Sequence, residues 1–171
     1  MVVSEGFARE EGCEAARDVA MLIPARAEYL CVVRAAFAKM AEVVGFCCEE
    51  AERLTLALEE ALTNAIRHSY GGPCERPISV KMHRVGCGAC RGEALEVVVR
   101  DYGRQVDPAT IKGRDLDKVE PGGLGVHIIR SLMDEVEYSR GERCGMQLRM
   151  VKYVPARAVE EETDQSAGSG L

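Results

Sequence analysis

The sequence lacks the features of a membrane or exported protein. No apolar run approaches the ~20 residues that a membrane-spanning helix needs. The stretch 1–10 has no basic segment followed by an apolar one, so we expect no signal peptide. An excess of positive charge is also missing, since 22 Lys and Arg face 28 Asp and Glu for a net charge of −6 at pH 7. Because nucleic acid and anionic membranes are recognised by basic faces, this balance argues against a general binder of either.

The composition that remains fits one folded domain. The chain has 171 residues, 47% of them hydrophobic, which is enough for a single hydrophobic core. We expect a flexible segment at 1–15, one domain at 16–155, and a disordered tail at 156–171 that is first acidic and then rich in Ser and Gly. With no export signal and no membrane span in view, the expected location is the cytoplasm.

Eight cysteines are a high number for such a chain. A disulfide framework is typical of secreted chains shorter than ~100 residues, so none is expected here. Cys31, Cys47 and Cys144 stand among apolar residues, which predicts small buried hydrophobic side chains. The single CxxC, Cys87 to Cys90, has no second pair at the spacing of a zinc site. Free thiols in a glycine-rich turn are therefore favoured over a metal or redox site.

The spacing of apolar residues predicts helices first and then strands, with one further helix between the strands. The predicted elements are a strand at 16–23, helices at 26–44 and 48–69, strands at 78–85 and 94–100, a helix at 124–133, and strands at 135–139 and 146–153. This order favours an α+β fold over a doubly wound sheet. We expect a two-layer α/β sandwich with a mixed, mostly antiparallel sheet and helices on one face.

The first candidate motif lies near the end of the second predicted helix. A spacing of four residues places Glu60, Asn64 and His68 on one helix face, next to the apolar stripe. A carboxylate at the edge of a cleft can act as a general base, and an amide oxygen can hold a hard cation such as Mg²⁺. Taken alone, the same spacing is more often an ordinary solvated helix face.

The second candidate motif is the end of a predicted strand, where Asp101 is followed by Gly103. A buried acceptor at this position suits the exocyclic amine of adenine, and glycine lets the backbone turn beside a ligand. An ordinary strand-to-turn sequence has the same pattern, so this motif is weak by itself.

The third candidate motif is a glycine-rich helix start with Gly122, Gly123 and Gly125. Exposed backbone N–H groups and the helix dipole at such a start favour an anion, and phosphate is the natural guest. The third glycine of a dinucleotide fingerprint is missing and no GxxxxGK[ST] occurs, so neither a Rossmann site nor a P-loop is predicted. A flexible loop before a helix is the alternative.

The order of the three motifs resembles the GHKL ATPase superfamily over about residues 16–153. Within that superfamily, Glu60-Ala-Leu-Thr-Asn64-Ala-Ile-Arg-His68 and the glycine-rich segment 122–136 are similar to the RsbW-like anti-sigma-factor serine/threonine kinases. The resemblance implies a Bergerat-type ATP-binding fold with ATP and Mg²⁺ as ligands. One departure is Gly145-Met146-Gln147, which stands where the family often has a small hydroxyl residue at the adenine pocket.

The resemblance also implies a role for each residue. Glu60 would be the general base that takes a proton from the acceptor hydroxyl, Asn64 would coordinate Mg²⁺, and Asp101 would bond the adenine amine. The remaining implied nucleotide-binding residues are His68, Gly103, Gly122, Gly123, Leu124, Gly125 and Val126. The implied protein is an ATP-dependent kinase that phosphorylates an anti-sigma-factor antagonist and sequesters a sigma factor by partner switching. It would act as a homodimer without direct contact to nucleic acid or membrane.

Two other functions stay open at this point. One is a nucleotide-gated switch that binds a regulatory partner without phosphotransfer. The other is a detached catalytic domain of a histidine kinase, which we rank last because its phospho-acceptor helix is absent and the linker between Gly103 and Gly123 is short for that class.

Overall fold

Five strands form one sheet in the residues that this computed structural model describes, 18–87, 92–111 and 124–155. The strands are β1 (Asp18–Ala25), β2 (Cys74–Cys87), β3 (Gly92–Asp101), β4 (Glu135–Arg140) and β5 (Met146–Tyr153). Their order across the sheet is β1-β2-β3-β5-β4, and each neighbouring pair is antiparallel. The predicted α+β sandwich with a mostly antiparallel sheet is confirmed, and among the described strands no parallel pair occurs.

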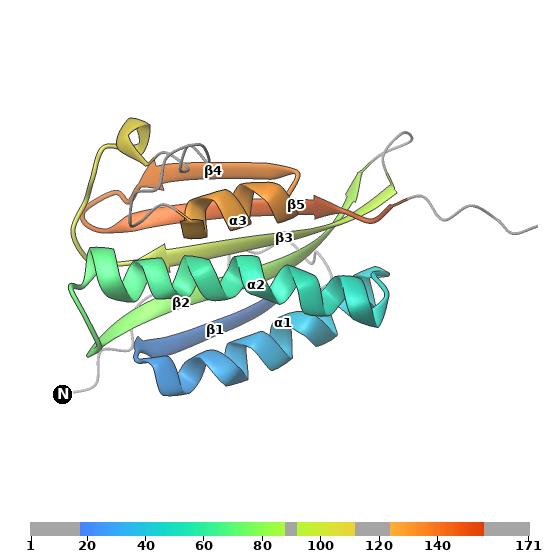
Figure 1. The fold of residues 1–171 in the computed structure, drawn as a ribbon, viewed down its shortest axis with the longest axis horizontal. Coiled ribbons are helices and arrows are strands. Elements are labelled where there is room, and N and C mark those ends of the chain that lie inside the picture. Colours follow the sequence, from blue (N-terminus) through green and yellow to red (C-terminus); the bar gives the residue numbers. More distant parts are fainter. Residues whose placement is uncertain (1–17, 88–91, 112–123, 156–171) are drawn as a thin grey trace, which may run out of the picture.

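The helices pack as a second layer on one face of the sheet (Figure 1). Gly45, with φ 123°, ends the first helix, and the Glu50 carboxylate accepts a hydrogen bond of 2.9 Å from the Cys47 N–H at the start of the second. The α-helices are α1 (Leu30–Val44), α2 (Cys48–Asn64) and α3 (Leu124–Leu132), with 3-10 turns at Ala27–Tyr29 and Pro108–Thr110.

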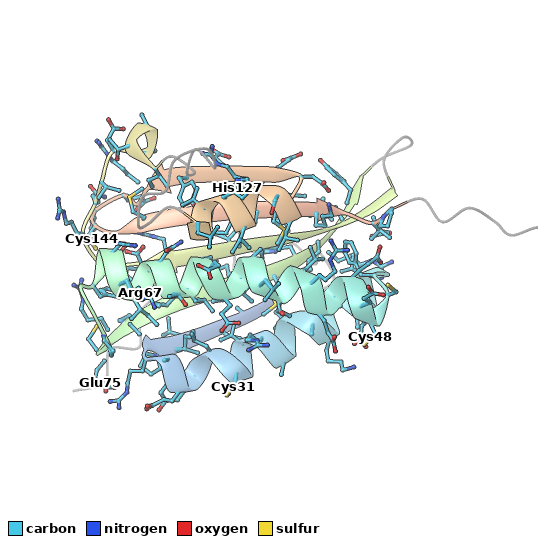
Figure 2. All side chains as sticks on the ribbon, in the orientation of Figure 1. Cys31, Cys48, Arg67, Glu75, His127 and Cys144 are labelled. Atoms are coloured by element: carbon cyan, nitrogen blue, oxygen red, sulfur yellow. The ribbon has the colours of Figure 1, made fainter. Side chains whose placement is uncertain are left out.

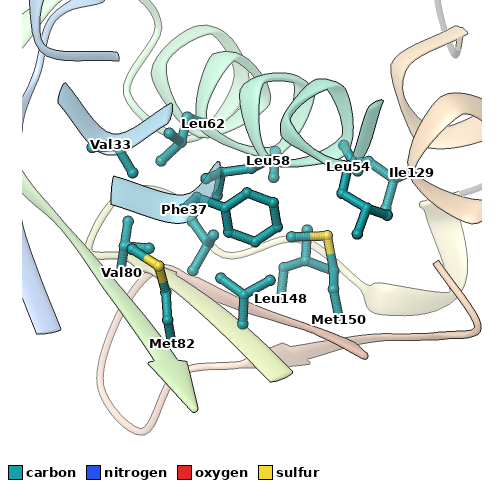
Figure 3. Close-up of a cluster of buried hydrophobic side chains, with 14 of the residues drawn as sticks. Val33, Phe37, Leu54, Leu58, Leu62, Val80, Met82, Ile129, Leu148 and Met150 are labelled. Atoms are coloured by element: carbon teal, nitrogen blue, oxygen red, sulfur yellow. The ribbon is translucent and has the colours of Figure 1, made fainter. Parts of the chain in front are cut away.

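The hydrophobic core lies between the two layers (Figure 3). Strand β3 alternates from Leu95 onward, so that Leu95, Val97 and Val99 turn toward the helices and are buried. Phe37 of α1 and Leu58 of α2 are fully buried against this row. The core therefore fixes the position of the helix layer relative to the sheet, and with it the position of the polar side chains at the edge of the core.

The predicted helix 48–69 changes its winding before it ends. After Asn64 the chain continues as one π-helical turn, Ala65–Ser69, in which the N–H of Tyr70 bonds to the carbonyl of Ala65 at 3.2 Å. Such wide turns recur at functional sites. This one carries Ser69 to the end of β3, where its carbonyl accepts a hydrogen bond of 2.9 Å from Arg104 N–H.

The predicted burial of three cysteines is wrong. Cys31 and Cys47 are exposed and Cys144 is half-buried, and their positions at the rim of the molecule can be followed for Cys31 and Cys144 in Figure 2. In the sequence of α1, Cys31 lies between the buried residues Leu30 and Val33, and its own side chain is exposed to solvent. Cys90, the side chain of Cys87, and the predicted tails at 1–15 and 156–171 lie outside the described residues.

The described residues include neither a cluster of metal-ligating side chains nor a membrane-spanning helix. In that part of the chain no group of three or more His, Cys, Asp or Glu side chains is arranged to hold a metal ion. No described helix combines the length and the hydropathy needed to cross a bilayer.

Candidate functional site

A cavity of about 430 Å³ opens between the end of α2, the start of α3 and the helix-facing side of the sheet. Its floor is apolar and comes from the sheet, with Val99, Met146 and Leu148. Five of the predicted site residues line its walls: Asn64, His68, Asp101, Gly125 and Val126. The structure thus brings residues of all three sequence motifs to one place.

The remaining predicted residues are distributed differently. Glu60 and Gly103 are next to the cavity without lining it, and Leu124 is 52% exposed at the start of α3. Gly122 and Gly123 lie outside the described residues, so the prediction for them stays a prediction.

Asp101 is the best-organised group of the site. Its side chain is only 5% exposed, and its Oδ1 accepts hydrogen bonds from the N–H groups of Gly103 at 2.9 Å and Met146 at 3.2 Å. Its Oδ2 accepts a third from the Ser69 hydroxyl at 2.9 Å. A buried carboxylate needs such partners. Each carboxylate oxygen has two acceptor positions, so Oδ2 keeps one for a donor in the cavity.

Two glycines allow the three segments around Asp101 to meet. A Cβ atom on Gly103 would lie 2.3 Å from the carbonyl oxygen of Ser69, and one on Gly145 would lie 2.1 Å from the carbonyl oxygen of Asp101. Gly145 also has φ +67°, which side chains rarely permit. At Gly103 the backbone thus approaches Ser69 of the π-helical turn, whereas the sequence analysis expected it to turn beside a ligand.

Tyr70 and Arg76 stabilise the turn that follows Asp101. The Tyr70 hydroxyl accepts a hydrogen bond of 2.7 Å from the Tyr102 N–H and donates one of 2.5 Å to the Pro77 carbonyl. The Arg76 guanidinium lies 4.8 Å from the centre of the Tyr70 ring and donates to the Tyr102 carbonyl. Burial raises the pKa of the Tyr70 phenol. These contacts hold the cavity wall in place before any ligand arrives.

At the other end of the cavity, the first turn of α3 packs directly on α2. A Cβ atom on Gly125 would lie 2.3 Å from Glu60 Oε2 and 3.3 Å from Asn64 Nδ2. The predicted common helix face is therefore confirmed for Glu60 and Asn64, which place a carboxylate and an amide side by side. His68 lies beyond α2, in the π-helical turn. A carboxylate can accept a proton, and an amide oxygen can ligate a hard cation such as Mg²⁺.

Two cavity residues were missed by sequence reasoning. Ser69 supplies a hydroxyl to Asp101, although Gly145-Met146-Gln147 lacks the small hydroxyl residue that the family often has. No local sequence pattern marked Ser69, because its position depends on the π-helical turn. The other is Tyr138 of β4, whose buried hydroxyl has no hydrogen-bond partner among the described residues. Burial raises the pKa of this phenol to about 12, so it stays a neutral donor.

These features together fit an adenine nucleotide. The free acceptor position on Asp101 suits an exocyclic amine, the apolar floor suits a flat base, and the buried Tyr138 hydroxyl has no partner among the described residues. The carboxylate and amide at Gly125 suit the phosphate end. Fold and site thus define the class of small ATP-binding domains in which one antiparallel sheet is covered by helices on one face.

Comparison with known proteins gives the family. A family model described as histidine kinase-like ATPase domain matches residues 23–152. The serine-protein kinase RsbW of Listeria innocua is 32% identical over 151 residues, covering 84% of this chain and 91% of that protein. RsbW of Oceanobacillus iheyensis is 30% identical over 155 residues, with coverage of 86% and 93%. The chain therefore belongs to the RsbW-like family of histidine kinase-like ATPase domains.

Solved structures are similar in fold at low sequence identity. The SiaB–SiaC complex from Pseudomonas aeruginosa matches with a TM-score of 0.58 and 18% identity, over 79% of this chain and 89% of that chain. The RsbU and RsbW domains of Rv1364c from Mycobacterium tuberculosis match with a TM-score of 0.55 and 17% identity, over 80% of this chain and 31% of that chain. Both support the two-layer architecture described above.

Proposed function

We propose that this protein is an ATP-dependent serine/threonine protein kinase that acts as an anti-sigma factor in the cytoplasm. Its substrate would be a hydroxyl of an anti-sigma-factor antagonist, and it would sequester a sigma factor and exchange partners after phosphorylation. The observation that carries the proposal is one cavity with the buried Asp101 carboxylate at one end and Asn64 at the other, where Glu60 lies beside Gly125 just outside the lining. The similarity to RsbW serine-protein kinases over most of the chain supports it.

The nucleotide would be held by both ends of the cavity. Asp101 would accept the adenine amine, and Asn64, His68 and the first turn of α3 would face the phosphates. The implied glycines of the segment before α3 would complete the phosphate side. Asn64 would ligate Mg²⁺, which neutralises phosphate charge when bound.

Phosphoryl transfer needs mainly positioning and one base. The acceptor hydroxyl oxygen would form a bond to the γ-phosphorus while the bond between that phosphorus and the ADP oxygen breaks. Glu60 would take the proton that the hydroxyl loses, so charge and atoms balance. Gly125 would keep the Glu60 carboxylate beside the phosphate end, since no side chain stands between them.

The partner proposals rest on the relatives. A protein partner is supported by the fold similarity to a structure of the SiaB–SiaC complex. We propose a homodimer that binds one antagonist or one sigma factor at a time. The domain would be residues 16–155.

One observation favours a second candidate, a nucleotide-gated switch without phosphotransfer. Glu60 does not line the cavity itself, because Gly125 packs across its carboxylate. A base in that position must move or be approached from the side before it meets an acceptor hydroxyl.

The test is transfer of label from γ-labelled ATP to the antagonist, with ATP binding measured in parallel. We expect labelled antagonist with the wild-type protein, and a loss of about 100-fold or more in Glu60→Gln with ATP affinity retained. The matched control is Glu59→Gln, because Glu59 is the preceding residue but pairs with Arg34 of α1 at 3.3 Å.

The outcomes separate the two candidates. Bound ATP without labelled antagonist would refute the kinase and support the switch. No ATP binding at all would refute both. Equal transfer by Glu60→Gln and wild type would remove Glu60 from the base role.

A further inference from the structure

Tyr138 is a buried polar group in the candidate site for which the chain itself provides no partner. Tyr138 is one of the residues that line the cavity, its hydroxyl oxygen is buried at the cavity wall, and no described residue bonds to it. Buried hydroxyls are nearly always paired in folded proteins, and an unpaired one lowers stability. An unpaired group on a cavity wall indicates a ligand or an ordered water as the missing partner.

The other hydroxyls of the same cavity are already committed. Ser69 donates its hydroxyl hydrogen to Asp101 at 2.9 Å, and Thr110 donates its own to the Asp107 carbonyl at 2.6 Å. Among the described hydroxyls that line the cavity, the Tyr138 hydroxyl is thus the one with both its hydrogen and its lone pairs available.

The register of the sheet defines where this hydroxyl stands relative to a bound base. Val99 pairs with Leu148 and Leu148 pairs with Tyr138, so these residues form one row across β3, β5 and β4 on the helix-facing side. All three line the cavity. The first two offer a flat apolar bed, and Tyr138 ends the row on the outermost strand, which Figure 1 shows at the edge of the sheet.

Asp101 stands at the opposite side of this bed. It belongs to β3, two strands away from Tyr138, which corresponds to roughly 10 Å between strand axes. The bed is therefore bordered by an acceptor on one side and a donor on the other. The groups suited to phosphate, Asn64 and Gly125, come from the helices above it.

We propose that Tyr138 donates a hydrogen bond to an acceptor of the nucleoside, a ring nitrogen of the base or a ribose oxygen, when an adenine nucleotide is bound. The proposal rests on the ATP site proposed above and adds a binding residue to it. The raised pKa of the phenol supports the direction of the bond, because a neutral phenol donates at physiological pH. Binding would remove the cost of the unpaired hydroxyl, so Tyr138 would favour the occupied state over the empty one.

The test uses Tyr138→Phe in the full chain, with Tyr29→Phe as a matched control. Tyr29 is 39% exposed and lies in the 3-10 turn before α1, away from the cavity. Titration calorimetry with ATP, ADP and adenosine gives the affinities, and thermal unfolding without ligand gives the stability of the empty protein.

We expect the two readouts of Tyr138→Phe to move in opposite directions. Its empty form unfolds at a higher temperature, because no unpaired hydroxyl is left in the fold. Its affinity for ATP, ADP and adenosine falls by a similar factor of about two to ten, as for one neutral hydrogen bond. Tyr29→Phe changes neither. Repeating the titration with deaza and 2′-deoxy analogues identifies the acceptor, because the difference between wild type and Tyr138→Phe disappears for the analogue that lacks it.

Each contrary result refutes a different statement. Wild-type affinities in Tyr138→Phe would overturn the proposal, whatever the change in stability. A loss for ATP and ADP without one for adenosine would place the hydroxyl on the phosphates and overturn its assignment to the nucleoside. A wild-type protein that binds none of the three ligands would refute the ATP site itself, and the role of Tyr138 with it.

Discussion

Gly125→Ala is the substitution for which the structure separates stability from activity most sharply. The added methyl group would lie 2.3 Å from Glu60 Oε2 and 3.3 Å from Asn64 Nδ2, whereas ordinary contact begins at 3.4 Å. The Glu60 carboxylate therefore has to move by about 1 Å, a distance at which displaced reacting groups lose about 100-fold in rate. The obstacle is the end of a flexible side chain, so the fold can yield there.

The effect on stability should be small for a second reason. Gly125 lies in the first turn of α3, and alanine is more favourable than glycine in a helix, by up to about 1 kcal/mol in the interior. This gain offsets the cost of moving Glu60, so the free energy of unfolding should stay within about 1 kcal/mol of wild type. We expect phosphotransfer to the antagonist to fall about 100-fold, with ADP affinity reduced much less.

The assay is single-turnover transfer of labelled phosphate, together with urea unfolding and ADP titration. Gly86→Ala on β2 is the control, because a methyl group there meets nothing within 4 Å. Wild-type transfer by a well-folded Gly125→Ala would refute the reasoning, since Glu60 would then not be needed where the structure places it.

Two further predictions concern the polar groups on either side of the cavity floor. Asp101→Asn should fold normally, because its side-chain carbonyl keeps the bonds from Gly103 and Met146 and its amide can donate to Ser69. ADP affinity should nevertheless fall more than tenfold, since an amide donor would face the adenine amine. An unchanged affinity in titration calorimetry would contradict this prediction. For Tyr138, the folded state keeps the phenol proton up to about pH 12, while an unfolded tyrosine loses it near pH 10. The free energy of unfolding of the wild type should therefore fall between pH 10 and pH 12 by up to about 3 kcal/mol more than that of Tyr138→Phe. A difference in free energy between the two proteins that stays constant over this pH range, measured by urea unfolding, would contradict this prediction.

Periodicity was sufficient to predict the type and order of the elements, but not all their limits. Strand β2 begins at Cys74, earlier than the predicted Ile78, and so includes Pro77. Pro77 is tolerated since it pairs with Pro24 of β1, while pairing with β3 begins only at Ile78. The insertion of β5 between β3 and β4 depends on long-range pairing, which no local pattern reveals.

The candidate site was predictable to a different extent on each of its walls. Helical spacing alone placed Asn64 and Glu60 on one face, and the structure confirms it. The Ser69 bond to Asp101 was not predictable, because it depends on one π-helical turn that has no sequence signal. The role of Tyr138 depends on β4 being the outermost strand beside β5, so alternation within β4 could not reveal it.

The bonds around Asp101 also have a consequence for the order in which the chain folds. Asp101 is joined to Ser69, 32 residues before it, and to Met146, 45 residues after it. During synthesis the amino-terminal part leaves the ribosome first, so the helices and β1–β3 can associate while β5 is still being made. The cavity floor is incomplete until β5 has paired with β3. A nascent chain therefore cannot be stabilised by nucleotide at its early stages, and ligand binding reports the completion of the sheet.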